Sequence, residues 1–464
     1  MTGSTLAARI IITLAAARML PPYDLGLYAI VNLVLGFAFL FADGGLTQSV
    51  VSKDGQPDQL SSLHWCNVLF GAAVGAAVCL AAPAVSAFYA QPRLLDLLLL
   101  AALNFAVAPF GQISRALLQK HLRFAELGGI EVASNVANTL AALVLLYLGT
   151  GVYGLILAQL AASLTRSALL AVAGRAFVRT RFRLSVRDIG AFLRFGLFQV
   201  GDRAVNFVNS RFDQLLIGWL LGPTMLGYYS MAWSLTVDPV YRINPILTTV
   251  AFPVFAKRQN DRTALRRGFL IVTKLLTTTN APMVFGVAAI APVAVPLLLG
   301  EQWRPAVPLV ELLSIVAIAR TVNNPVGSLV LAVGRADMSF YWTATQFAVQ
   351  TPVYAVMLAY AGLVPATCAV CLINVAAVLL VYVFLLRPIL GAFFLDYARA
   401  FLPAICLAIG MALGVRLLSM TAIDSRTGLL AAQLALGAIL YGGMTMLFRR
   451  GDVSEIAGLV TSRT

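Results

Sequence analysis

The sequence predicts an all-α, polytopic integral membrane protein with about 14 transmembrane helices, and two observations lead to this fold class. Hydrophobic residues make up 60% of the 464 residues, and charged residues only 11%. A soluble protein of this size needs far more charge to cover its surface. The apolar residues are also gathered in runs close to the roughly 20 residues with which a helix crosses the hydrocarbon core.

Short polar connectors separate these apolar runs, and each run is predicted to be one membrane-spanning helix. In chain order the expected spans are 2–20, 26–50, 61–89, 94–118, 126–149, 152–174, 188–221, 225–255, 268–299, 306–333, 337–361, 363–386, 400–418 and 427–448. The run 188–221 is longer than a straight crossing requires. A bend, a tilt or an extension beyond the bilayer is therefore expected there.

A short segment occurs twice, as LPPYDLGLY at 20–28 and as LGPTMLGYY at 221–229. Because each copy lies between long apolar runs, the chain is predicted to contain one six-helix membrane unit twice. The expected parts are an N-terminal lobe at 1–174, a basic connector at 175–187, a C-terminal lobe at 188–386, and two further helices with a tail at 387–464. Duplicated membrane units are the usual build of secondary transporters.

The basic residues between the spans predict the orientation of the chain. One alternate set of connectors carries most of them, with the densest stretches at 175–187 and 257–267, whereas the other set holds only Arg93, Arg304 and Arg426. By the positive-inside rule the basic side is cytoplasmic, so both termini are expected there and the protein in the cell inner membrane. The net charge of +14 is therefore explained without a nucleic-acid partner.

Catalytic and cofactor motifs are missing from the sequence. It has no GxGxxG, P-loop or HExxH motif and only two histidines, and no connector is long enough to fold as a catalytic domain. All five cysteines lie inside apolar runs, including the C-x-x-C pair Cys368 and Cys371, and are interpreted as packing residues. No enzymatic activity, cofactor or metal site is predicted.

Polar residues inside the spans indicate where a substrate would bind. A charged side chain at mid-bilayer costs at least roughly 2.5–3.5 kcal/mol, so such residues are expected to face a protein or water-filled interior. The seventh span carries one polar face, formed by Asp202, Asn206, Asn209 and Asp213. Two shorter stripes consist of Glu131, Asn135 and Asn138, and of Gln159, Ser163 and Arg166. For the Glu131 stripe, pairing between helices without a ligand is the favoured interpretation.

The candidate substrate-binding cations are Arg18, Arg166, Arg203, Arg211, Arg242, Lys274 and Arg320, with Asn206 and Asn209 as polar neighbours. An interior biased toward arginine suits a polyanion such as a diphosphate, because guanidinium groups bind phosphate oxygens in pairs. The acids expected in the same interior are Asp43, Asp202, Asp213 and Asp238. They either keep the arginines paired in the empty state or bind a coupling cation, H⁺ or Na⁺, and the residues leave both roles open.

Two stretches resemble a known family. ARMLPPYDLGLYAI, followed by LFADGGLTQSVV, is similar to the opening of polysaccharide flippases, and SRFDQLLIGWLLGPTMLGYYSMAW is similar to the start of their second half. These flippases are the polysaccharide-transporter branch of the multidrug/oligosaccharidyl-lipid/polysaccharide exporter superfamily. The resemblance marks Asp43, Arg211 and Asp213 as functional. Trp219 departs from the pattern, since the family commonly has a basic residue there.

The resemblance implies two six-helix lobes arranged as a V, plus two C-terminal helices. It also implies that the protein flips an undecaprenyl-diphosphate-linked oligosaccharide across the cytoplasmic membrane by alternating access, for exopolysaccharide, O-antigen or capsule. Membrane lipids and a polysaccharide polymerase or export machinery are the implied partners. The first alternative is a cation-coupled multidrug exporter of the same fold, for which an acidic interior is expected. The second, a membrane enzyme of glycan assembly, is disfavoured by the short connectors.

Overall fold

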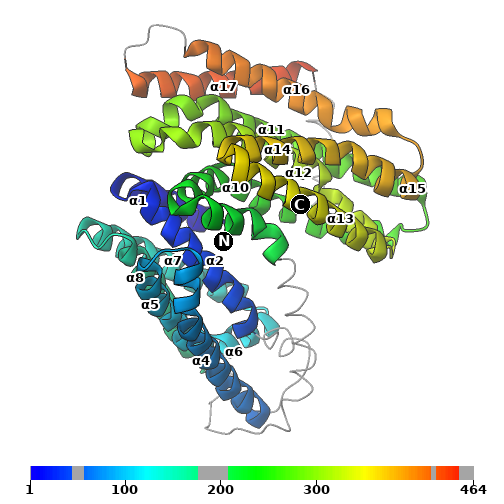
Figure 1. Ribbon diagram of the computed structural model, residues 1–464. Helices are drawn as coiled ribbons and strands as arrows, with labels where there is room; N and C mark the ends of the chain where they lie inside the picture. The colour runs from blue at the N-terminus through cyan, green and yellow to red at the C-terminus, as the bar shows by residue number, and fades with distance from the viewer. Residues whose placement is uncertain (1, 44–56, 176–206, 420–424, 449–464) are drawn as a thin grey trace. The chain divides into compact units, whose positions relative to one another are not determined.

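The computed structural model describes residues 2–43, 57–175, 207–419 and 425–448, and every regular element in these ranges is a helix (Figure 1). Among the described residues, eight helices are long and apolar enough to cross a membrane, or nine when one bent pair counts as a single span. The predicted all-α, multi-pass membrane fold is confirmed. The total of about 14 spans stays a prediction.

The chain divides into two compact units, Met1–Gly227 and Tyr228–Thr464. The predicted connector between the lobes, 175–187, lies almost wholly outside the described residues. The predicted limits of the two lobes therefore stay a prediction, and the two units are described here one at a time.

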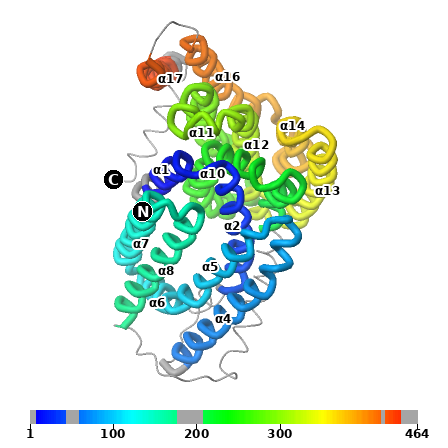
Figure 2. Tube along the Cα trace, turned by 60° about the vertical axis from the view of Figure 1, so that its left-hand side comes forward, coloured from blue at the N-terminus to red at the C-terminus, as the bar shows by residue number. Residues whose placement is uncertain are grey.

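The first unit packs helices that are close in the sequence against one another. Its helices are α1 (Thr2–Met19), α2 (Pro22–Asp43), α4 (Pro57–Phe88), α5 (Arg93–Val107), α6 (Pro109–Lys120), α7 (Phe124–Tyr147) and α8 (Val152–Gly174), followed by a helix at 207–220 and the first turns of α10 (Gly222–Lys257). The closest neighbours are α7 with α8, α4 with α5, and α6 with α8 (Figure 2). Each copy of the repeated segment lies at the start of a helix, α2 or α10, where proline is well tolerated.

The predicted span 94–118 is divided by a bend of 45° between α5 and α6. Pro109 causes the bend, because its nitrogen has no hydrogen to donate and its ring clashes with the preceding turn. A neighbouring helix satisfies a carbonyl that the break exposes, since the Ser167 hydroxyl of α8 donates to the Val107 oxygen at 3.0 Å. The bend thereby fixes α6 against α8, which brings polar side chains of α6 and α8 to one place.

The second unit continues α10 and adds longer helices. They are α11 (Arg262–Leu298), a 3₁₀ helix η1 (Glu301–Ala306), α12 (Val307–Ala332), α13 (Ala336–Ala361), α14 (Leu363–Val381), a π-helical turn η2 (Tyr382–Leu386), α15 (Arg387–Leu390), α16 (Phe394–Leu418) and α17 (Arg426–Phe448). α11 packs against both α12 and α16, and α17 runs beside α16 (Figure 1). Buried aromatic rings, among them Phe269 and Tyr397, fill the core between these helices.

Candidate functional site

The first unit contains a polar cavity of about 480 Å³. It lies among α2, α5, α6, α7 and α8, and the polar side chains that line it are Asn32, Asn104, Gln112, Arg115, Asn135, Asn138, Gln159, Ser163, Arg166 and Ser167. Polar groups are rare inside membrane helices because unpaired ones are costly there, and they mark ligand pathways more often than packing surfaces. This cavity is the strongest candidate site in the first unit.

A three-residue charge cluster contributes two of its members to the cavity wall. The Arg166 Nη2 atom is 3.0 Å from the Glu131 Oε2 atom, and the Arg115 Nη2 atom is 3.7 Å from Oε1 of the same carboxylate. The Glu131 side chain is 21% exposed, against 38% for Arg166 and 44% for Arg115. One acid thus lies behind two bases that line the cavity, which leaves the cluster with one excess positive charge.

The Arg166 side chain also has an unused donor, because its Nε atom is buried and has no hydrogen-bond partner among the described residues. A guanidinium group with a free N–H beside a salt-bridged Nη atom can still bind one more acceptor oxygen. Because the Nε atom is buried, an anion would reach Arg166 through the exposed part of its guanidinium group.

The cavity is also lined by amides. The Gln159 amide nitrogen donates to the Tyr28 hydroxyl at 2.6 Å and to the Asn32 amide oxygen at 3.1 Å. Asn138 lies seven residues beyond Glu131 on α7, or roughly 10 Å at about 1.5 Å of rise per residue. Amide groups both donate and accept, so these side chains are suited to neutral hydroxyl-bearing groups.

A separate polar cluster lies in the second unit, around Trp233. The guanidinium of Arg320 on α12 stacks over the Trp233 ring at 5.2 Å and donates to the Tyr241 hydroxyl at 2.7 Å. The indole nitrogen of Trp233 donates to Asp238 at 3.1 Å. Two of the predicted residues, Arg320 and Asp238, are thus brought to the same aromatic ring, and a further bond to Asn374 at 3.4 Å restrains the guanidinium.

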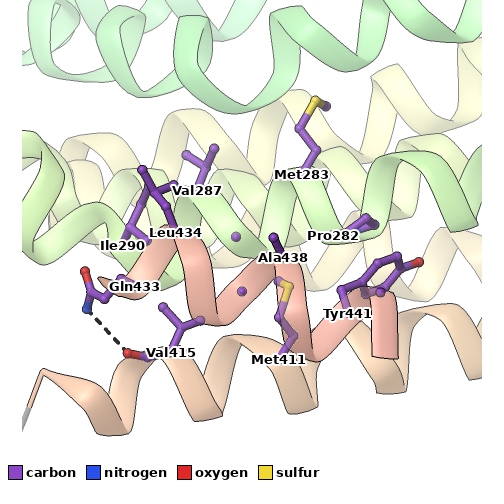
Figure 3. Close-up of a pocket in the computed structure, with 13 residues that line it drawn as sticks. Pro282, Met283, Val287, Ile290, Met411, Val415, Gln433, Leu434, Ala438 and Tyr441 are labelled. Atoms are coloured by element: carbon purple, nitrogen blue, oxygen red, sulfur yellow. Dashed lines mark hydrogen bonds between the residues drawn. The ribbon is translucent and has the colours of Figure 1, made fainter. Parts of the chain in front are cut away.

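The second unit also holds an apolar pocket of about 470 Å³ between α11, α16 and α17 (Figure 3). Its walls include Met283 and Val287 of α11 and Met411 of α16. Polar side chains close its two ends: the Gln433 amide donates to the Val415 carbonyl at 3.4 Å, and the Tyr441 hydroxyl donates to the Thr278 carbonyl at 2.8 Å. The donors of both side chains are bonded to backbone carbonyls, whereas the Gln433 amide oxygen is buried without a hydrogen-bond partner among the described residues; the rest of the wall is apolar.

The other predicted site residues are dispersed. Arg18 and Arg242 are exposed, whereas Asn209, Arg211, Asp213 and Lys274 are partly buried. Arg211 donates to the Gln214 side chain at 3.3 Å, and Asp213 accepts from the Gln214 backbone nitrogen at 2.9 Å. Asp202, Arg203, Asn206 and the side chain of Asp43 lie outside the described residues. That all these charges share one interior stays a prediction.

Sequence reasoning did not select Arg115 and Gln112, which line the cavity. It favoured pairing between helices for the Glu131 stripe, and Glu131 does pair with Arg166 and Arg115 on neighbouring helices. Arg115 is close to the end of its predicted span, where a basic residue is ordinarily a connector charge. The available signal was the i, i+3 spacing of Gln112 and Arg115, which places two polar side chains on one face of α6. A spacing shared by only two residues cannot be distinguished from chance unless it is known that α6 bends toward α8.

Comparison with known proteins gives consistent results. The model of a family described as "Polysaccharide biosynthesis protein" matches residues 15–308. The chain is 34% identical to the teichuronic acid biosynthesis protein TuaB of Bacillus subtilis, over 66% of this chain and 64% of that protein. It therefore spans slightly less than two thirds of that relative. It is 30% identical to the lipopolysaccharide biosynthesis protein WzxC of Escherichia coli, over 82% of this chain and 78% of WzxC.

Among solved structures, the lipid II flippase MurJ in an inward closed conformation shares this fold, with a TM-score of 0.74. The superposition covers 97% of this chain and 98% of MurJ, at 14% sequence identity. At that identity the likeness concerns the fold alone. The resemblance found in the repeated segments is confirmed by these matches.

Proposed function

This chain belongs to the polysaccharide biosynthesis protein family, and we propose on that basis that it is a flippase for lipid-linked oligosaccharides. Its substrate would be an oligosaccharide joined to a polyprenyl chain, undecaprenyl in the simplest case, through a diphosphate. It would carry this substrate from the cytoplasmic to the outer leaflet of the inner membrane, for exopolysaccharide, O-antigen or capsule. Support comes from the family, from relatives named for surface-polysaccharide biosynthesis, and from a fold shared with a lipid flippase.

The observation that carries the proposal is the mixed chemistry of the first unit's cavity. Arg115 and Arg166 line it together with amides, of which Gln112 and Asn135 lie within one helical turn of the charged cluster and Asn138 and Gln159 about two turns away. A diphosphate-linked sugar has matching groups, with two phosphates followed by neutral rings that carry hydroxyls. Guanidinium groups fit phosphate oxygens, and amides fit hydroxyls, so one bound head group would satisfy both kinds of side chain.

In this mechanism Glu131 is the resident counter-ion of the empty site. It pairs with Arg166 and Arg115, so that both guanidinium groups share one carboxylate and the empty site keeps a single excess positive charge instead of two. A diphosphate would replace the carboxylate as the partner of both arginines. When the substrate leaves, Glu131 pairs with them again, which lowers the cost of release.

The remaining assignments belong to the same proposal. Arg211, Asp213 and Asp43 are proposed as functional residues because of the family resemblance. Arg320 and Asp238 are proposed as functional because both contact Trp233. The apolar pocket of the second unit would hold part of the polyprenyl chain. Both termini would be cytoplasmic, with H⁺ or Na⁺ as coupling cation and a polysaccharide polymerase as a downstream partner. Translocation breaks and forms no covalent bond, so no catalytic residue is assigned.

Deletion of the gene in its own organism tests the function. We expect loss of the surface polysaccharide and accumulation of the lipid-linked oligosaccharide in the inner leaflet, both restored by the wild-type gene. In proteoliposomes, a fluorescent polyprenyl-diphosphate saccharide should become accessible to a membrane-impermeant quencher only when the protein is present. Unchanged polysaccharide and no accumulated precursor in the deletion strain would rule the proposal out.

A multidrug exporter is the alternative that the same experiment separates. Such a protein needs an acid that is free to bind an organic cation, whereas Glu131 of this cavity is held between two arginines. If the deletion strain keeps its polysaccharide and instead becomes sensitive to cationic dyes, the alternative is correct.

A further inference from the structure

A proline inside α11 removes one bond from the hydrogen-bond ladder of that helix. Pro282 lies within α11, and the nitrogen of a proline carries no hydrogen. In an unbroken helix that hydrogen would bond the carbonyl oxygen of Thr278, four residues earlier. A carbonyl oxygen without a donor is costly inside a membrane, so another group has to supply one. The break therefore offers a bonding point to a neighbouring helix.

The donor comes from α17. The Tyr441 hydroxyl donates to the Thr278 carbonyl oxygen at 2.8 Å. Tyr441 and Pro282 line the same end of the apolar pocket (Figure 3). The ring of Tyr441 also packs against a buried cluster that includes Ala281 of α11 and Ala408 of α16. A single side chain of α17 thus fills the position next to the break and completes the ladder of α11.

The same stretch of α11 is fixed independently to α10. The Asn280 amide nitrogen donates to the Asn244 amide oxygen of α10 at 2.9 Å and to the Leu276 carbonyl oxygen of its own helix at 3.0 Å. Both asparagines are buried. Because this part of α11 is already held in place, the bond from Tyr441 positions α17 relative to α11 and not the reverse.

The two helices that this bond joins both form walls of the apolar pocket. Met283 and Val287 of α11 follow the break directly, and Leu434 and Ala438 of α17 line the pocket with them. An apolar chain between two walls gains dispersion energy from each, and a gap of 0.5 to 1 Å already removes roughly a quarter to a half of it. The separation of α11 and α17 therefore decides how well the pocket holds a chain.

We propose that Tyr441 is a positioning residue of the apolar pocket: by donating to the carbonyl that Pro282 leaves without a helical partner, it sets the separation of α11 and α17. This separation determines the affinity of the pocket for an apolar chain. The inference rests on the proposed function only for the identity of that chain as a polyprenyl tail, because the separation is measured without any ligand.

A double-mutant cycle distinguishes the hydrogen bond from the packing of the ring. Tyr441→Phe keeps the ring and removes the donor, whereas Pro282→Ala supplies the backbone N–H that the Thr278 carbonyl lacks. With a photoreactive polyprenyl phosphate as probe, we expect Tyr441→Phe to weaken binding roughly threefold in the wild-type background and not at all in the Pro282→Ala background. Tyr360→Phe, at a side chain that is 88% exposed, is the control. Equal losses in both backgrounds, or none in either, would overturn the proposal.

Spin labels measure the separation directly. Leu298 of α11 and Ile439 of α17 are exposed and are replaced by labelled cysteines after the five native cysteines have been changed to serine. We expect a narrow distance distribution that Tyr441→Phe broadens, but not when Pro282→Ala is also present. An unchanged distribution in Tyr441→Phe would contradict the positioning role even if transport fell.

Two further results keep the inference and the proposed function apart. If the Pro282→Ala protein does not accumulate, Pro282→Gly supplies the same backbone N–H and takes its place in the cycle. If the cycle and the distances behave as expected while the deletion strain keeps its polysaccharide, the role of Tyr441 stands and the proposed function is wrong.

Discussion

The cavity of the first unit and the pocket of the second are nearly equal in volume, about 480 and 470 Å³, yet opposite in chemistry. The first is lined by amides and by two arginines that share one carboxylate. The second is lined by methionine, valine and leucine, with its polar side chains directed at backbone carbonyls. The comparison shows that helix packing creates cavities of similar volume in both units. A few side chains on each helix then decide whether the polar head or the apolar chain of an amphiphilic ligand can bind there.

The two sites also differ in how they stay stable when empty. An apolar pocket loses little by being open, because most of its wall has no polar group that needs a hydrogen bond; the buried Gln433 amide oxygen is the exception here. A charged cavity is costly when its charges have no partner, and here Glu131 pairs with both arginines and reduces the uncompensated charge to one. The predictions below test this contrast, beginning with the change that should affect transport most.

Arg166→Ala removes the guanidinium that lies closest to Glu131 and leaves the carboxylate with Arg115 at 3.7 Å. Because truncating one member of a partly buried charge pair is costly, we expect transport to fall by roughly tenfold or more. Arg166→Lys should be intermediate, since an ammonium cannot bind two phosphate oxygens side by side. Polysaccharide output is normalised to membrane protein level, with the exposed Arg335→Ala as control. Normal output from Arg166→Ala would exclude the cavity from the transport path.

Glu131→Gln tests the counter-ion separately from the cations. The amide keeps the shape of the side chain but no longer neutralises either arginine, so the anion should bind more tightly and leave more slowly. We expect the apparent KM and the maximal rate to fall together, each by roughly several-fold. Proteoliposome kinetics at varied substrate concentration measure both. A raised KM would mean that Glu131 contacts the substrate favourably, against the proposed role.

Gly286→Phe tests the apolar pocket. A Cβ atom at Gly286 meets only the Met411 methyl at 3.7 Å, so the helix accepts a side chain there and the ring enters the pocket. We expect a loss of about two- to threefold for a long polyprenyl substrate and none for a short-chain analogue. Gly129→Phe in α7 is the matched control. Equal losses for both chain lengths would indicate damage to packing and not to lipid binding.

Glu301→Gln should have the smallest effect. Glu301 accepts from Arg426 at 2.6 Å, at the end of the pocket's wall, but both side chains are more than half exposed. Exposed pairs contribute little, so we expect an unchanged melting temperature in detergent and unchanged transport. A clear drop in melting temperature would show that this ion pair, and not apolar packing on α16, holds α17 in place.

Several features of the site were predictable because they depend on spacing along one helix. Glu131, Asn135 and Asn138 share a face of α7, and Gln159, Ser163 and Arg166 share a face of α8. Both faces line the cavity, apart from Glu131 itself, which lies behind the arginines. The bend at Pro109 was within reach of the same reasoning, since proline inside a long span interrupts the helix. The helix toward which α6 turns could not be predicted, because contacts between helices involve residues far apart in sequence.

The sequence by itself determined the membrane environment, the helical fold, the family and the repeat, because these follow from local composition and from matches along the chain. Only the tertiary structure decided that Arg115 and Arg166 share Glu131, that α11, α16 and α17 enclose an apolar pocket, and that Tyr441 bonds the Thr278 carbonyl. In an all-apolar chain every helix face can pack against lipid or protein, so hydrophobicity does not select the partner helix. Close packing between particular side chains makes that selection.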